Sequence, residues 1–265
     1  LFFVACEKDE SKTNARSEYY ANINCSTKEF DIESLMTETG IDNFKLSQLP
    51  EAQENAKHIL ISTKEFSKMS IYYEKNNIFD EQINQILDLS NLIIEASNNG
   101  FYNETFQLYE QLYEIVKTFD RFVLESNYEL QDLVYDIDSP SVKLPIEQLE
   151  NEKESAITFV NSIENLYPQF GSLPKEAKIN VMAVSIYENI KQNETDDKAA
   201  PDCRKVAKDN YLQSMAVNTA SFQLALMTCP LSGPACGVCI AIAGASYAAA
   251  TGVATYQYNQ ALKNC

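Results

Sequence analysis

The feature that most constrains this chain is a long uncharged stretch near its C-terminus. Between Asp209 and Lys263 there is no Asp, Glu, Lys, Arg or His, although the whole chain has a net charge of -17. Residues 1–200 carry 17 basic and 36 acidic side chains, whereas residues 201–265 carry 4 and 2. In so acidic a chain, an uncharged stretch of this length indicates a segment that is kept out of water.

The cysteines of this stretch have a spacing that predicts a helical hairpin. Cys203 and Cys229 are 26 positions apart, and so are Cys239 and Cys265. A helix cannot continue through the Pro-Leu-Ser-Gly-Pro of residues 230–234, so this segment separates two arms of equal length. Folding the arms back on each other places Cys203 beside Cys265 at the open end and Cys229 beside Cys239 at the turn.

Two further cysteines complete the predicted disulfide set. Once the hairpin pairs are assigned, Cys236 remains to pair with Cys25, which interrupts a polar N-terminal segment. The alternative is that Cys236 and Cys239, which are separated by two residues, form a redox pair or half of a zinc site. Because no second cysteine pair or histidine lies nearby, we predict disulfides and no metal.

The two arms differ in side-chain size, which predicts close packing between them. The second arm, between Ile240 and Tyr256, is also apolar enough to suggest a membrane span. Ala, Gly and Thr dominate this segment, so we expect a hairpin buried in the protein. The bulky face of the first arm holds Leu212, Met215, Thr219, Phe222 and Leu226, and the small face of the second holds Gly237, Ala241, Ala245, Ala248 and Gly252.

The rest of the chain reads as amphipathic helices, and we predict an all-α helical bundle. Only 7 Gly and 8 Pro are present, which is few for strands joined by tight turns. Residues 31–200 form an acidic helical body, and residues 201–265 form the Cys-rich hairpin packed into the same bundle. Apolar residues recur every three or four positions in the predicted helices. The first begins at Pro50, the second runs from Ile78 to the stop at Asn98-Asn99-Gly100, the third from Tyr102 to about Val134, and the fourth from Ile146 to Leu166. The last follows a predicted N-cap at Ser172.

The first residues, Leu1-Phe2-Phe3-Val4-Ala5-Cys6, are a hydrophobic run that ends on a cysteine after a small residue. This run resembles the end of a bacterial lipoprotein signal peptide. The resemblance implies that residues 1–5 are a signal remnant and that Cys6 carries the lipid. It departs from the family pattern in having Phe3 where Leu is usual.

The segment after Cys6 continues this resemblance. Glu7-Lys8-Asp9-Glu10 is similar to the charged tetrad that follows the lipidated cysteine in surface-exported lipoproteins of the Bacteroidota. The resemblance implies an extracytoplasmic protein on the outer membrane, exposed at the cell surface. Residues 6–30 are then a polar tether.

The sequence contains no recognisable catalytic set. His58 is the one histidine and lies in a helical segment, where we expect it to be at the surface or half-buried. Pairs such as Asp136 and Asp138 are expected to be solvated loop residues, and no Gly-rich phosphate loop is present. We therefore predict no cofactor, and the acidic charge argues against a nucleic-acid partner.

These features predict a lipid-anchored cell-envelope protein that acts by binding or scaffolding an unknown ligand. The alternative prediction is a protein of a different functional class. The Cys-rich, Ala/Gly-rich residues 203–265, following an acidic N-terminal portion, loosely resemble bacteriocin precursors of the halocin type. That resemblance implies a membrane-active C-terminal effector that is released from its precursor.

Overall fold

The computed structural model describes residues 7–8, 23–24, 32–73, 78–125, 146–193, 202–229 and 234–265. These residues are almost entirely helical, which confirms the predicted all-α class. Outside the described residues lie the carboxylate pair of Asp136 and Asp138 and the predicted continuation of the helix from Tyr102 toward Val134. The elements are β1 (Glu7–Lys8), β2 (Ile23–Asn24), α2 (Ile32–Thr39), α3 (Asn43–Ser47), α4 (Pro50–Tyr73), α5 (Ile78–Asn98), α6 (Tyr102–Glu125), α7 (Ile146–Leu166), the 3-10 helix η2 (Pro168–Ser172), α8 (Lys175–Asn193), α9 (Asp202–Thr228) and α10 (Pro234–Lys263).

Local sequence determines several helix ends. Pro50 is the first residue of α4, where its missing N–H is not needed for an intrahelical hydrogen bond. Gly100 follows α5 with a φ of 76°, a left-handed conformation that glycine adopts without steric cost. The N–H of Phe101 then donates to the carbonyl of Ala96 at 2.9 Å, which closes the end of the helix.

The predicted N-cap at Ser172 is wrong. Ser172 is the last residue of η2, and its hydroxyl donates to the carbonyl of Gln169 at 2.8 Å. The next helix begins later, at Lys175, directly after Pro174. Pro168 near the start of η2 favours a tight turn there, and this turn uses the serine for its own closure.

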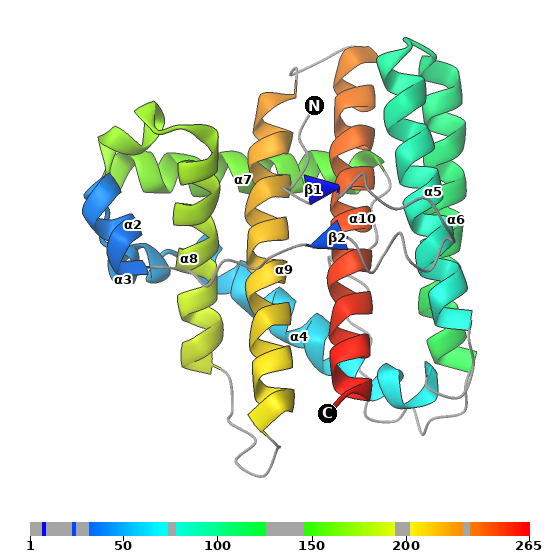
Figure 1. Ribbon diagram of the computed structural model, residues 1–265. Coiled ribbons are helices and arrows are strands. Elements are labelled where there is room, and N and C mark those ends of the chain that lie inside the picture. The colour runs from blue at the N-terminus through cyan, green and yellow to red at the C-terminus, as the bar shows by residue number, and fades with distance from the viewer. Residues whose placement is uncertain are drawn as a thin grey trace.

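The helices form two layers (Figure 1). In the first layer α8, α9, α10 and the α5–α6 pair lie side by side, and each contacts its neighbour. In the second layer α4 and α7 cross behind α9 and contact it. The short helices α2 and α3 pack on α8 at one edge. Helix α10, which carries no charged side chain before Lys263, is therefore flanked by α9 on one side and by α5 on the other.

The face that α10 turns toward α9 differs from the prediction. Tyr247 stacks on Phe222 and Tyr258 stacks on Tyr211, each with ring centroids 4.8 Å apart. The bulky face of α9 thus meets tyrosines. Ala245 lies two positions before Tyr247, about 200° around the helix, so the small face points away from α9. Ala245 is fully buried, and α5 packs closely on α10.

Helix α10 is also the described helix that has the length and apolarity of a membrane span. The span covers Val238–Lys263 with a mean hydropathy of 1.6, and 67% of its most apolar window is buried inside the protein. Aliphatic and aromatic side chains from α5, α7 and α9 join it in one hydrophobic core. Helices α9 and α10, which form the hairpin predicted within residues 201–265, pack against α5, α7 and α8 of the bundle.

The predicted tether contains the one strand pair of the described residues. Glu7 pairs with Asn24 and Lys8 with Ile23 in antiparallel register. Nothing in the sequence pattern of residues 6–30 indicated this pairing, because alternation cannot be recognised over two residues.

Candidate functional site

Two disulfides hold the α9–α10 hairpin at its two ends, as the cysteine spacing predicted. Cys203 is bonded to Cys265 at the open end, with their Cα atoms 5.8 Å apart. Cys229 is bonded to Cys239 beside the turn, with their Cα atoms 5.5 Å apart. Both separations are ordinary for disulfides between neighbouring helices.

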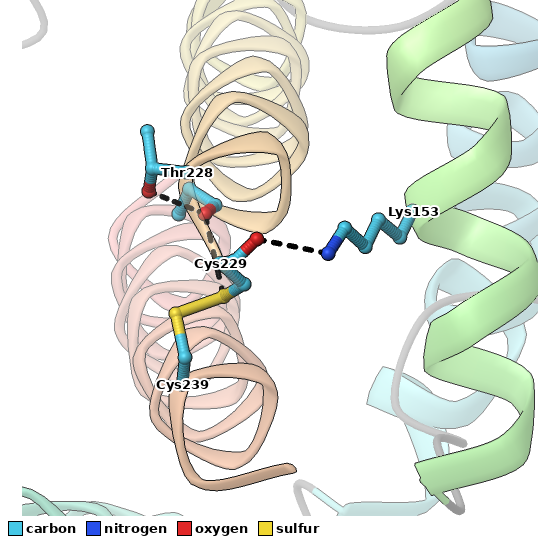
Figure 2. The surroundings of a disulfide bond; sticks show 5 residues. Lys153, Thr228, Cys229 and Cys239 are labelled. Carbon is cyan, nitrogen blue, oxygen red and sulfur yellow. Dashed lines mark hydrogen bonds between the residues drawn. A yellow bond between two sulfur atoms is a disulfide. The ribbon is translucent and has the colours of Figure 1, made fainter. Parts of the chain in front are cut away.

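The turn end of the hairpin is also tied to the second layer. The ammonium of Lys153 on α7 donates a hydrogen bond of 2.9 Å to the carbonyl of Cys229 (Figure 2). Lys153 is 7% exposed, so this bond lies in the interior. In the same turn the Thr228 hydroxyl donates a hydrogen bond of 2.7 Å to the carbonyl of Ala225. Carbonyls freed at the end of α9 are thereby satisfied.

The other predicted cysteine sites are outside the described atoms. Cys6 and Cys25 lie outside the described residues, and the side chain of Cys236 is not described although its backbone begins α10. The lipidation of Cys6 and the Cys25–Cys236 disulfide stay predictions. In the part of the chain that the structure describes, no group of three or more His, Cys, Asp or Glu residues has the geometry to hold a metal ion.

A second group of polar residues lies where α4 and α7 cross α9 and α10. Paired amide hydrogen bonds between Asn55 and Gln223, of 3.3 and 3.0 Å, join α4 to α9. His58 lies one turn after Asn55, and Thr219 lies one turn before Gln223, so each shares a helix face with this pair. We define the interior polar cluster as six residues on α4, α7, α9 and α10: Glu54, His58, Glu152, Tyr247, Thr219 and Thr251.

Exposure decreases along the interior polar cluster. The side chain of Glu54 is 71% exposed and that of His58 is 31% exposed, with 3.8 Å between the Glu54 Oε1 and His58 Nε2 atoms. Glu152 of α7 is half-buried. Tyr247 is 6% exposed and lies in the core. The cluster thus extends from solvent at α4 to the contact between α9 and α10.

Burial and charge alter the acidity of two groups in this cluster. Burial raises the pKa of Glu152; the nearby His58 opposes this rise and the carboxylate of Glu54 adds to it. Burial also raises the pKa of Tyr247, an effect that the hydroxyls of Thr219 and Thr251 oppose and the charge of Glu152 increases. Glu152 and Tyr247 therefore influence each other across the two layers.

The innermost hydroxyls of the interior polar cluster lie around the hydroxyl of Tyr247. Thr219 is 9% exposed and Thr251 is 6% exposed. Both threonine hydroxyls interact with the Tyr247 hydroxyl, so this buried group has polar partners from α9 and α10.

A third polar group joins α8 to α9 and is satisfied internally. The carboxylate of Asp209 accepts from the hydroxyl of Tyr187, from the ammonium of Lys191, and from Gln213 at 3.2 Å. Burial of Asp209 opposes its ionisation, but the bonds from Lys191 and Tyr187 outweigh burial and hold its pKa below the usual range. The same contacts outweigh burial at Lys191 and raise its pKa. This group acts as a clamp between helices.

The interior polar cluster was not found from the sequence. His58 is half-buried, as predicted, but the carboxylates were assigned to solvation, and Glu152 is an exception to that assignment. One signal was available: Tyr247 and Thr251 are four positions apart in an otherwise small and apolar helix, so they share a face. Their partners on α4 and α7 are distant in sequence and have no motif.

Comparison with family models, curated proteins and solved structures finds no match to this chain.

Proposed function

We propose that this protein is an extracytoplasmic, lipid-anchored binding or scaffolding protein without enzymatic activity. The observation that carries the proposal is the closure of the α9–α10 hairpin by Cys203–Cys265 and Cys229–Cys239. Disulfides persist in oxidising compartments such as the periplasm and the cell surface. Their presence supports the compartment that the lipobox-like N-terminus implies.

The anchor is assigned to Cys6. Leu1–Ala5 supply the hydrophobic run and the small residue that precede a lipidated cysteine. The net charge of -17 keeps the body of the protein away from an anionic bilayer surface, so a covalent anchor is the reasonable means of attachment.

Metabolic labelling tests this proposal. The chain is expressed in a Gram-negative host with Leu1–Cys6 at the end of a lipoprotein signal peptide, and the cells are fed an alkyne-tagged fatty acid. We expect a labelled protein in the membrane fraction, loss of label in Cys6→Ala, and retained label in the control Cys25→Ala. Equal labelling of the wild type and Cys6→Ala would refute the anchor. Protease treatment of intact cells then tests exposure at the cell surface.

The packing of α10 bears on the alternative of a released membrane-active effector. Helix α10 is covered by α5, α6 and α7 as well as by α9, and this supports a binding protein with α10 as its core. Dye release from liposomes distinguishes the two functions. We expect none from the full-length oxidised protein, and release after proteolytic separation of residues 203–265 would favour the effector.

A further inference from the structure

We propose that the exposed face of α5 binds a cationic amphipathic helix of a partner protein. This inference rests on the proposed binding function and names the kind of partner. Helices α5 and α6 lie at the edge of the first layer, opposite α8 (Figure 1). The exposed face of α5 follows a spacing of four, three, four and three positions, which places its residues in one row along the helix. We call this row the α5 stripe; its residues are Glu81, Gln85, Asp88, Leu92 and Glu95.

The charges on and around the α5 stripe are all of one sign. Residues 78–116, which include α5 and most of α6, contain no Lys, Arg or His. Three carboxylates of the stripe recur every seven residues, which is two helical turns or about 10 Å. No basic side chain that the structure describes forms an ion pair with these three. The acidic residues of this segment are Asp80, Glu81, Asp88, Glu95, Glu104, Glu110 and Glu114.

The position of Glu95 is unfavourable for the helix itself. Glu95 lies in the last turn of α5, and this turn contains no basic residue. The C-terminal end of a helix carries partial negative charge, so a carboxylate there is repelled and a cation is attracted. A basic side chain from a partner would relieve this repulsion. The placement of Glu95 therefore supports a role in binding over a role in stability.

Large apolar side chains are exposed beside these carboxylates. Leu92 lies between Asp88 and Glu95 in the α5 stripe and is 46% exposed. Phe101 and Tyr102, in the turn that follows α5, are 57% and 47% exposed and extend the apolar surface beyond Glu95. A surface that alternates carboxylates with exposed apolar groups is complementary to a helix whose apolar row is flanked by Lys or Arg. The partner is therefore both cationic and amphipathic.

The same charges disfavour two other occupants of this face. In a two-fold dimer formed through the α5 stripe, the carboxylates of one copy would face those of the other and repel them. An anionic bilayer surface is repelled for the same reason. A cationic helix is the occupant that relieves the repulsion and also covers Leu92.

Fluorescence anisotropy of the oxidised full-length protein tests the proposal with three labelled helical peptides of about three heptads each. The first peptide has a leucine row flanked by lysines at seven-residue spacing. The second has glutamates in place of the lysines, and the third has the composition of the first with its lysines distributed around the helix. We expect saturable binding of the first peptide, at least about fivefold weaker binding of the third, and no binding of the second.

A pair of triple variants tests the charges of the stripe. The stripe variant is Glu81→Gln/Asp88→Asn/Glu95→Gln, and it should bind the first peptide about tenfold more weakly than the wild type. Its control changes the net charge equally and should bind within about twofold of the wild type. Thermal unfolding should show the stripe variant to be at least as stable as the control, because the charge at the end of α5 is removed. The control neutralises exposed carboxylates on α2, α7 and α8: Glu38→Gln, Glu154→Gln and Glu176→Gln.

A pair of leucine variants tests the apolar part of the surface. Leu92→Ala removes an exposed side chain that the partner helix would cover, so the first peptide should bind about threefold to fivefold more weakly. Leu166→Ala is the matched control, since Leu166 at the end of α7 is 50% exposed. The control should bind the peptide as the wild type does.

Several outcomes would overturn the inference. Absence of saturable binding of the first peptide would mean that the α5 stripe is a solvated surface. Equal losses in the stripe variant and its control would show that net charge alone attracts the peptide. Sedimentation of a dimer that Leu92→Ala disrupts would assign this face to a second copy. None of these results affects fatty-acid labelling at Cys6, so failure of this inference is distinguishable from failure of the proposed function.

Discussion

The ammonium of Lys153 bonds the carbonyl of Cys229 at 2.9 Å across 76 positions of sequence. This bond joins α7, in the second layer, to the disulfide-closed turn of the hairpin in the first layer (Figure 2). A buried ammonium requires compensation, and a carbonyl freed at the end of a helix supplies it. The contact therefore fixes the position of the hairpin relative to the crossing helix.

Replacing Lys153 with Met should destabilise the protein by about 1.5–3 kcal/mol, because a hydrogen bond from a charged group is lost and the Cys229 carbonyl is left buried without it. The methionine keeps most of the apolar stem, so packing changes little. Chemical denaturation measures the difference. The control Lys57→Met, at an exposed position on α4, should unfold within about 0.5 kcal/mol of the wild type. Equal losses in both variants would contradict the role of the bond.

The two disulfides should contribute unequally to stability. Cys203–Cys265 closes a separation of 62 residues and Cys229–Cys239 closes one of 10. The chain-entropy relation gives about 4 kcal/mol for the longer loop and about 3 kcal/mol for the shorter one. The double variant Cys203→Ser/Cys265→Ser should therefore have a lower free energy of unfolding than Cys229→Ser/Cys239→Ser. The reverse order would show that the tie from Lys153 to the turn outweighs loop entropy.

The Asp209 clamp should make the protein sensitive to acid. Because the pKa of Asp209 is held below its usual range, its contribution to stability is present above the unfolded pKa and is lost as the pH falls through the folded pKa. Asp209→Asn should cost about 1 kcal/mol at neutral pH, given that Lys191 is half-exposed.

This difference between the wild type and Asp209→Asn should shrink as the pH falls below the ordinary pKa of an aspartate, and it should vanish below the lowered folded pKa of Asp209. Thermal unfolding as a function of pH measures it. Asp88→Asn, at an exposed position on α5, is the control and should follow the wild type throughout. A difference in stability that persists in acid would mean that the asparagine at position 209 destabilises the protein for steric reasons.

Glu152 should have the opposite pH dependence. Its pKa is raised by burial, so the stability it contributes is present below its unfolded pKa and is lost as the pH rises through the folded pKa. Glu152→Gln should therefore stabilise the unliganded protein at pH 7, by about 0.5–1 kcal/mol, and have little effect at pH 4. Destabilisation at pH 7 would instead indicate that the carboxylate is held by a structural partner.

The cysteine assignments predict the thiol content of the purified protein. Six of the seven cysteines should be oxidised, and Cys6 should be the exception. Alkylation without reduction, followed by peptide mapping, should recover Cys25 linked to Cys236 together with the two hairpin disulfides. Free thiols at Cys25 and Cys236 would remove the third bond and leave the hairpin unaffected.

Much of the fold was predictable because its signals are local. Pro50 and Gly100 act on the backbone of their own segment, and the helices begin and end beside them. The failure at Ser172 has the same origin, since a serine can close a 3-10 turn as readily as it caps a helix. The candidate site was less predictable, because it draws on α4, α7, α9 and α10, which are distant in sequence and meet only in the folded bundle.

The sequence by itself determined the helical class, the burial of the uncharged stretch and the two disulfides of the hairpin, since periodicity, missing charge and equal cysteine spacing are properties of one segment. Tertiary structure alone decided which face of α10 meets α9 and which polar groups come together. The sequence pattern of α10 allows either Tyr247 or Ala245 to face α9. Which of them does so depends on how the space on each side of α10 is filled, by large side chains from α9 and by close approach of the α5 backbone.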